Sequence, residues 1–411
     1  MDFFGDLSIE VLDYLLQFLD GKSLANLLKT NHRFRNLCSR EVYWQKLCGQ
    51  DFIIDSLPSS FKQWYQCYGY YYGKFGFLGI NTYRKIRRAW NKIEKFYSEL
   101  ESDITFEDGA TKEDIQLFQQ RLGSHITLPK DYICSLMIHN GQKIDEHVLN
   151  GLSSGCFGSL YAYDDYKTEF LASTTNVLIA QNHIAADQNN CDISLICLTI
   201  AVTNRFWSNS HYLCTTLSVP ESSEIVFGNV ISSPQLRHRY SQPSWKIAND
   251  FTEWLEEFAN GLYEHRFALS FNEPVTDNNE LLRYYFNDGC EAKYGAFSCK
   301  VHTAFIPESS VVTQPRFFFT YRITLSMDDD ADEAMSCKLE SRHWVITDGH
   351  NNEEKVDGPG VIGFFPVLKY KFTFFQFLIL TFIFAGQETN FHMLPVFTFQ
   401  PISVKCQVFS E

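Results

Sequence analysis

Apolar residues near the start of the chain repeat with the period of an amphipathic helix. The positions Leu12, Leu15, Leu16 and Leu19 follow the i, i+3, i+4, i+7 spacing of one helical face, and Gly21 ends the pattern. Two more stripes of this kind follow, at Leu24, Leu27 and Leu28 and at Phe34, Leu37, Trp44 and Leu47. Three short helices bury too little surface to be stable alone, so we expect a partner to cover part of their apolar surface.

The middle of the chain combines helical stripes with extended segments. Residues 51–82 are rich in aromatic residues and glycine, and we expect a packed connector with aromatic anchors there. A longer helical stripe runs from 86 to 100, and another helix begins after Thr111, which can cap its N-terminus. Strands after Gly155 and a closing helix over 247–262 complete a mixed α+β unit.

From about Ala296 the hydrophobic period changes to two, which is typical of strands. Segments 297–303, 317–325 and 338–347 alternate in this way. An all-β sandwich of the immunoglobulin type is the expected result. The predicted fold class is therefore multidomain α+β, with a small helical domain at 1–50, a connector at 51–82, an α+β domain at 83–265 and a β-sandwich at 280–411.

Composition supports a folded protein of two or three domains. The 411 residues are 45% hydrophobic and 16% aromatic, which argues against extended disorder. A formal net charge of -14 disfavours nonspecific binding to nucleic acid or to an anionic membrane, because those surfaces attract clustered Lys and Arg. We therefore expect neither of them as a partner.

Cysteine usage indicates a reducing compartment. The 12 cysteines are scattered, without a Cys-x-x-Cys pair or a Cys/His cluster of zinc-finger spacing, and the N-terminus lacks the positive region of a secretory signal. We expect a cytoplasmic or nuclear protein without a metal site. The apolar run from Phe372 to Ala385 is about 14 residues long, shorter than the roughly 20 residues of a membrane-spanning helix.

Two short motifs match enzyme signatures in sequence, but the secondary structure expected around them does not fit those signatures. Residues 358–363 fit Gly-x-Gly-x-x-Gly, but a dinucleotide site needs a helix after this motif, and a strand is expected there. Residues 151–155 fit Gly-x-Ser-x-Gly, but a polar loop replaces the strand before a nucleophile elbow. His139 and His343 have no recognisable catalytic partner. We therefore expect no catalytic residue and no cofactor, so that the protein is not an enzyme.

The N-terminal pattern resembles the F-box. The matching pieces are Leu7-Ser8-Ile9-Glu10-Val11-Leu12, Leu15-Leu16-Gln17-Phe18-Leu19-Asp20, Ser23-Leu24, Arg33-Phe34, Leu37 and Tyr43-Trp44-Gln45-Lys46-Leu47. The family usually has proline where Ser8 stands, and serine can cap the same turn. The resemblance implies that the segment binds Skp1 through Leu7, Glu10, Val11, Leu12, Leu15, Leu16, Leu19 and Trp44.

The middle of the chain resembles the SMI1/KNR4 domain, also called SUKH. The matching pieces are an acidic helix that ends at Leu122-Gly123, then Leu128-Pro129-Lys130-Asp131-Tyr132, then Asn140-Gly141. In this pattern Gly123 ends a helix and Pro129 begins one, while Asn140 and Gly141 supply the left-handed residues of a tight turn.

The C-terminal strands resemble the ApaG domain. The matching pieces are Thr320-Tyr321-Arg322-Ile323, Ser341 to Asp348, and Gly358 to Pro366. Domains of this family have been associated with phosphate-containing ligands. The resemblance therefore implies a candidate site for an anion or a substrate at Arg342, Trp344, Gly358, Gly360 and Gly363.

The order F-box, SUKH-like domain, ApaG-like domain resembles a family of ubiquitin-ligase adaptors. It implies a non-catalytic substrate-recognition subunit of an SCF ligase, joined through Skp1 to cullin-1, with the two C-terminal domains holding the protein substrate. Two alternatives stay open: a regulatory protein of the ApaG type that senses phosphate or nucleotide, and a scaffold with a degenerate F-box. No residue identifies the substrate.

The ApaG pattern breaks after Leu368. Part of the family's sandwich is replaced there by the apolar run from Phe372 to Ala385. Phe, Leu and Ile codons are what a pyrimidine tract encodes, and Ala385-Gly386 can be read from a splice acceptor. Our hypothesis is that the run within 369–390 is translated intron, and transcript reads that cover it continuously would refute this origin.

Overall fold

The computed structural model describes residues 7–383 with internal gaps. The gaps are 124–125, 145–154, 163–164, 188–196, 204–208, 215–225, 233–244, 271–279, 289, 306–315, 329, 332–336, 348–352, 360–364, 366 and 369–372. Within the described ranges, no helix is both long and apolar enough to cross a bilayer.

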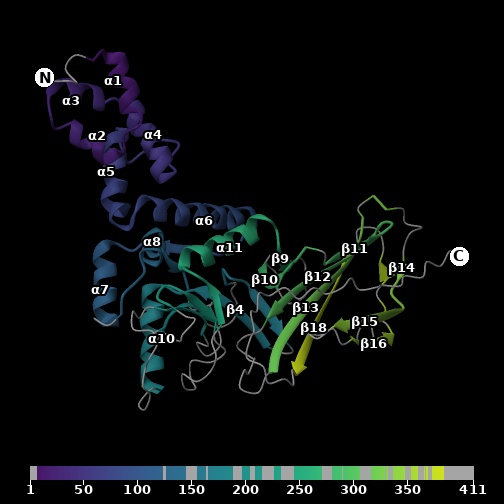
Figure 1. Cartoon of the computed structure of the whole chain (residues 1–411). Coiled ribbons are helices and arrows are strands. Elements are labelled where there is room, and N and C mark those ends of the chain that lie inside the picture. The colour runs from purple at the N-terminus through teal and green to yellow at the C-terminus, as the bar shows by residue number, and fades with distance from the viewer. Residues whose placement is uncertain are drawn as a thin grey trace.

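The N-terminal lobe contains four short helices instead of the three expected from the hydrophobic stripes. The third stripe divides at Ser39, where one helix ends and a turn at Arg40 begins the next. Side chains of Ser8, Asp20 and Asn31 cap the first three N-termini. The helices are α1 (Ile9–Leu16), α2 (Gly21–Leu27), α3 (His32–Cys38) and α4 (Glu41–Phe52), and they form the lobe at one end of the molecule (Figure 1).

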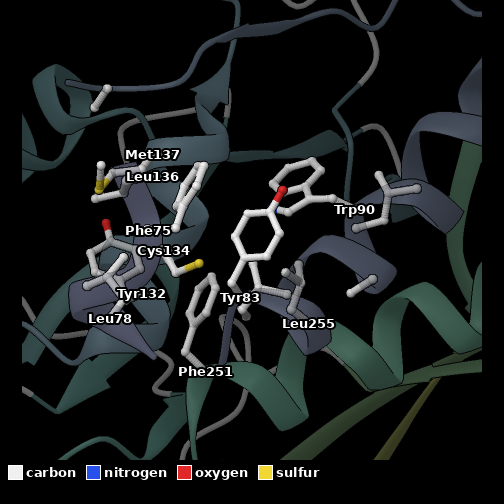
Figure 2. Packing of buried hydrophobic residues seen from close by; sticks show 14 of the residues in the cluster. Phe75, Leu78, Tyr83, Trp90, Tyr132, Cys134, Leu136, Met137, Phe251 and Leu255 are labelled. Atoms are coloured by element: carbon white, nitrogen blue, oxygen red, sulfur yellow. The ribbon is translucent and has the colours of Figure 1, made fainter. Parts of the chain in front are cut away.

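The connector is helical and packs into the core. It consists of α5 (Trp64–Phe75) and the short 3-10 helix η1 (Gly76–Leu78), and it leads directly into the long helix α6 (Ile80–Glu99). Figure 2 shows Phe75 beside Leu136 and Met137, so the end of α5 packs against the middle domain. The expected aromatic anchoring of this segment is thus seen in the packing.

The middle domain places helices against a meandering sheet. Trp90 of α6 donates its indole N–H to Ser135 Oγ at 3.0 Å, and Thr111 with Asp114 forms a capping box. The helices are α7 (Lys112–Leu122), α8 (Lys130–Ile138), α10 (Thr174–Asp187) and α11 (Phe251–Tyr263). The strands are β1 (Phe106–Asp108), β2 (His139–Gln142), β3 (Ser159–Ala162), β4 (Asp165–Leu171), β5 (Cys197–Thr203), β6 (Asn209–Cys214), β7 (Val230–Ser232) and β8 (Trp245–Ala248).

The turn expected at Asn140-Gly141 is a short strand instead. Both residues lie in β2, which pairs with β1, and only Gly141 has a positive φ, of 89°. The Asn140 side chain joins two segments, since its amide donates to Glu107 Oε2 at 3.2 Å and its oxygen accepts from the Thr174 backbone at 3.1 Å. Asparagine serves here as a bridge between elements and not as a turn former.

The C-terminal region consists of β-strands, as the period-two pattern predicts. Its strands are β9 (Phe267–Ser270), β10 (Glu280–Tyr285), β11 (Glu291–Tyr294), β12 (Phe297–Phe305), β13 (Arg316–Met327), β14 (Cys337–Lys338), β15 (Ser341–Thr347), β16 (Glu353–Pro359), β17 (Val367–Leu368) and β18 (Thr373–Ile383). With the helical N-terminus and the mixed middle domain, this confirms the predicted fold class. The predicted domain limits stay predictions.

The apolar run after Leu368 takes the position of a regular strand. Strand β18 pairs antiparallel with β13 from Thr373 opposite Ser326 to Ile383 opposite Arg316. Continuous pairing of this kind needs only β-forming residues, so it is independent of how the segment arose. The intron hypothesis therefore stays a prediction.

The sheets of the middle and C-terminal domains join into one. Strand β10 pairs in parallel with β3, where Leu282 lies opposite Ser159, and the combined sheet has 12 strands. Gly158, with a φ of 89°, lies at this junction, where an added Cβ would be 3.1 Å from the backbone of β10. The two domains therefore share backbone hydrogen bonds as well as side-chain contacts.

We predict that Gly141→Ala destabilises the protein by more than about 2 kcal/mol. Its φ is positive, and the new Cβ would lie 2.5 Å from the Ser173 backbone nitrogen. The matched control is Gly69→Ala in α5, where no atom lies within 4 Å of the new Cβ. We expect this control to stabilise by about 0.4–1 kcal/mol. Urea denaturation of both variants measures the difference, and equal effects would contradict the close approach at β2.

Candidate functional site

One face of α1 belongs to the core of the N-terminal lobe. Leu12 and Leu16 are buried and belong to the same hydrophobic cluster as Leu24 and Leu37. Asp13 holds α1 against α4, because its carboxylate accepts hydrogen bonds from Arg40 Nη1 at 2.5 Å and from the hydroxyl group of Tyr43. The helix is therefore fixed in orientation.

The opposite side of α1 and the turn after it carry a second apolar stripe, which is exposed. Val11, Tyr14, Leu15 and Phe18 follow the i, i+3, i+4, i+7 spacing, and their exposed fractions are 45%, 63%, 43% and 71%. The Tyr14 and Phe18 rings contact edge to face, with centroids 5.1 Å apart. Ile9 at the start of the helix is also exposed. A surface helix normally has a polar outer face, so this stripe, which we call the outer stripe, is typical of a binding surface.

The residues predicted to contact Skp1 differ in how exposed they are in the structure. Val11, Leu15 and Glu10 are exposed, and Leu7 and Leu19 are half-buried. The prediction omitted three exposed apolar residues, Ile9, Tyr14 and Phe18. The i, i+3, i+4, i+7 spacing of the outer stripe is visible in the sequence and could have indicated this second apolar face.

Three of the predicted contact residues are buried inside the lobe, and their part in Skp1 binding stays a prediction. Leu12 and Leu16 face the core, and Trp44 is only 1% exposed. The Trp44 indole N–H donates to the Cys38 carbonyl at 2.7 Å, and its ring lies 5.2 Å from that of Tyr68. These three side chains belong to the hydrophobic core that includes the lobe.

The residues predicted to hold an anion are only partly within the described residues. On the hairpin of β15 and β16, Arg342 lies opposite Gly358, and Trp344 lies two positions further along β15. The side chains of Arg342 and Trp344, and the whole of Gly360 and Gly363, lie outside the described residues. The pairing agrees with the expected hairpin, while the anion site stays a prediction.

His139 on β2 contacts side chains of α6 and has a structural role. Its Nε2 lies 2.6 Å from Glu94 Oε1, and its ring contacts Trp90 with centroids 4.6 Å apart. Arg87 donates two hydrogen bonds to the same carboxylate, at 2.9 and 2.8 Å. Burial raises the pKa of Glu94, but the hydrogen bond from His139 and the charge of Arg87 outweigh it and lower the pKa overall. The three side chains join α6 to β2, and they form no nucleophile arrangement.

A buried histidine lies among positive charges in the C-terminal sheet. His302 on β12 is opposite Arg322 on β13, and both are buried. Burial, together with the charges of Lys300 and Arg322, lowers the pKa of His302 to about 4. The imidazole is therefore neutral near pH 7. In the part of the chain that the structure describes, no three His, Cys, Asp or Glu side chains gather as metal ligands.

Comparison with known domains defines the class of the protein. Family models match in one order: the F-box domain at residues 4–46, the SMI1/KNR4 family (SUKH-1) at 109–257 and the ApaG domain at 307–383. The chain therefore carries these three domains, which confirms the resemblances drawn from the sequence. The outer stripe lies within the F-box match.

The chain is similar over most of its length to F-box only protein 3. The relative from Bos taurus is 27% identical over 360 residues, which cover 86% of this chain and 71% of the relative. The relative from Homo sapiens is also 27% identical, over 86% of this chain and 70% of its own length. These matches support the role of an F-box adaptor protein.

The C-terminal domain has bacterial relatives. Protein ApaG of Methylobacillus flagellatus is 43% identical over 74 residues, which cover 18% of this chain and 55% of that protein. Among solved structures, an ApaA protein from Bordetella pertussis is 28% identical, with a TM-score of 0.19, and the match covers 21% of this chain and 66% of that one.

We predict that Leu16→Ala and Leu15→Ala have different effects, although they are neighbours. Removal of the buried Leu16 side chain should cost about 2–5 kcal/mol of lobe stability, whereas removal of the exposed Leu15 side chain should change it by at most about 0.5 kcal/mol. Hydrogen exchange of the α1 amides in increasing urea measures both. Similar effects would show that the two faces of α1 are assigned wrongly.

We predict that His302 makes the C-terminal sheet less stable in acid. An unfolded histidine binds a proton below about pH 6.5, while folded His302 stays neutral until about pH 4, so stability falls as the pH drops through this interval. The slope is at most about 1.4 kcal/mol per pH unit. Urea denaturation at pH 7, 5.5 and 4.5 should show a smaller slope for His302→Asn than for the natural chain. Identical slopes would contradict the buried neutral state.

Proposed function

We propose that the protein is the substrate-recognition subunit of an SCF-type E3 ubiquitin ligase. In this proposal the F-box binds Skp1, and through Skp1 the protein joins cullin-1. The SUKH-like and ApaG-like domains hold a protein substrate, and the protein itself performs no catalysis. The observation that carries the proposal is the outer stripe, an exposed apolar surface on a fixed helix inside the F-box match.

The outer stripe has the properties of a helix that binds in a groove. Such recognition uses apolar anchors at i, i+3, i+4 and i+7, which is the spacing from Val11 to Phe18. Binding energy concentrates in large rigid side chains, and the contacting rings of Tyr14 and Phe18 are of this kind. Because α1 is already folded and held by Asp13, little ordering entropy is lost on binding.

The rest of the molecule is suited to holding a substrate at a fixed position. One continuous hydrophobic cluster extends from Leu12 in the F-box to Leu281 on β10. The sheet then continues into the C-terminal domain, and α1 and the C-terminal strands lie at opposite ends of the molecule (Figure 1). A ligase adaptor accelerates transfer by proximity, so a rigid body between its two binding surfaces favours the reaction. The proposed location is the cytoplasm, the nucleus or both.

We predict that the double variant Leu15→Asp, Phe18→Asp weakens Skp1 binding at least about 100-fold, which corresponds to a loss of about 1.4 kcal/mol for each of the two exposed anchors. The fold should persist, since both side chains are exposed. The matched control is Leu117→Asp, an exposed leucine on α7 outside the F-box, which should bind Skp1 normally. Calorimetric titration of the full chain with purified Skp1 measures all three proteins.

Two outcomes of this titration would reject the proposal. If the natural chain does not bind Skp1, the protein is not an SCF adaptor. If the double variant binds as tightly as the control, the outer stripe is not the Skp1-binding surface. Circular dichroism of each variant separates loss of binding from loss of fold.

A further inference from the structure

A groove lies where the F-box lobe meets the middle domain. Its volume is 420 Å³, which falls in the range of about 300–1,000 Å³ that is typical of ligand sites. Its lining comes from the end of α4 with the loop after it, from α5, from α6 and from the end of α8. The polar lining residues used below are Asp55, Ser56, Tyr71, Lys74, Tyr83 and Arg87.

The walls of the groove are aromatic and already packed. Phe52, Phe75 and Tyr83 line it and are buried, and Figure 2 shows Phe75 and Tyr83 in the packed core. The Tyr83 ring lies 5.4 Å from that of Phe52 and 4.5 Å from that of Phe75, measured between centroids. The half-buried ring of Tyr71 also contacts Phe52, with centroids 5.6 Å apart. A ligand therefore meets flat apolar surfaces that are formed before it binds, so little ordering entropy is lost.

The charged groups around the groove offset one another. Lys74 and Arg87 are the cations of the lining, and Asp55 is its carboxylate. Arg87 donates two hydrogen bonds to Glu94, at 2.9 and 2.8 Å. Burial lowers the pKa of Lys74, and the negative charge of Asp108 acts on it in the opposite direction. With all three carboxylates counted, the groove has no excess of positive charge to attract an anion, and its two cations oppose the entry of another cation.

Two tyrosine hydroxyl groups of the lining have no acceptor. Tyr71 and Tyr83 form no hydrogen bond through these groups within the described part of the chain. Only 3% of Tyr83 is exposed, yet its hydroxyl group is not sealed in the core without a partner as that of Tyr132 is, so the exposed part of Tyr83 is this group. Because Tyr83 lines the groove, its hydroxyl group faces the groove. Burial raises the pKa of Tyr71 and of Tyr83, so both are protonated donors at pH 7.

We propose that this groove binds a proline-rich segment of a partner protein, whose rings pack against the aromatic walls and whose carbonyl oxygens accept hydrogen bonds from Tyr71 and Tyr83. A proline residue offers a carbonyl acceptor and no N–H donor, which suits a groove that supplies donors. Its ring is apolar and uncharged, which suits aromatic walls between charges that offset one another. Proline-rich segments adopt the extended polyproline II helix before they bind, and aromatic-lined grooves recognise them in this form. The proposal goes beyond the adaptor role and does not depend on Skp1.

Other classes of peptide match the groove less well. An acidic or basic side chain would lose its hydration there without a net attraction in return. A helical peptide uses its carbonyl groups in its own hydrogen bonds, so it offers few of them to Tyr71 and Tyr83. An extended peptide without proline offers the same carbonyl groups, but it loses more conformational entropy on binding and brings N–H groups that need acceptors.

The test is a fluorescence-polarisation titration of the full chain with four capped, labelled hexapeptides. One contains only proline, one has Ala in place of every proline, and two have Glu or Lys in place of the middle two prolines. We expect hexaproline to bind at least about tenfold more tightly than the Ala peptide, because proline fixes φ before binding. Its affinity should change less than about twofold between about 0.05 and 0.5 M NaCl, since no ion pair forms. Equal binding of hexaproline and the Ala peptide, or tighter binding of the Glu or Lys peptide, would overturn the proposal.

Three variants locate the binding, and a fourth is the matched control. Tyr71→Phe and Tyr83→Phe keep the rings, and combined they should weaken hexaproline binding about tenfold, because each lost hydrogen bond corresponds to roughly a factor of three. Ser56→Trp fills the groove from an exposed position of its lining and should abolish binding. Tyr65→Phe changes an exposed tyrosine of α5 outside the lining and should bind as the natural chain does.

Binding elsewhere on the molecule would give a different result. Hexaproline binding that survives Ser56→Trp, or a loss in Tyr65→Phe equal to that in the combined variant, would overturn the assignment to this groove. Circular dichroism of each variant separates loss of binding from loss of fold. The titration contains no Skp1, and Skp1 binding should be unchanged in the combined variant, so failure of this site is distinguishable from failure of the adaptor role.

Discussion

The aromatic packing between α4, α5 and α6 is the contact on which the arrangement of the molecule depends. Phe52 at the end of α4 contacts the rings of Tyr68, Tyr71 and Tyr83, with centroids 5.2, 5.6 and 5.4 Å apart. Phe75 continues the series toward α8. Aromatic side chains bury large areas with few rotatable bonds, so they fix the angle between the F-box lobe and the middle domain.

Two different kinds of interaction join the three domains of the molecule. Side-chain packing joins the F-box to the middle domain, while backbone pairing of β10 with β3 joins the middle domain to the C-terminal sheet. A groove remains at the first junction, whereas the second junction is closed, since Gly158 allows the backbones to approach.

Sequence periodicity predicted the helices and strands well. It predicted less well which face of a helix is buried. The helical stripe at α1 was correct, but apolar residues surround this helix, and periodicity alone does not say which side is buried. Trp44 was predicted as a contact from the F-box resemblance, and in the structure it is buried, with its indole N–H donating to the Cys38 carbonyl. Pairing of β10 with β3 joins residues far apart in the chain, and local patterns carry no such information. Asn140 was misassigned for a related reason, since its bridging partners are distant in sequence.

The small size of the F-box explains why its first helix is apolar on two sides. The lobe needs Leu12 and Leu16 for its own core, and a unit of this length cannot bury a second face as well. Exposure of Tyr14 and Phe18 therefore costs solubility in the free chain, a cost that natural proteins carry mainly where a partner removes it. Because Asp13 and the buried leucines hold α1 in the lobe, the outer stripe faces a fixed direction on the molecule. The SUKH-like and ApaG-like domains then occupy a defined position relative to the outer stripe, which is the property that the proposed adaptor role requires.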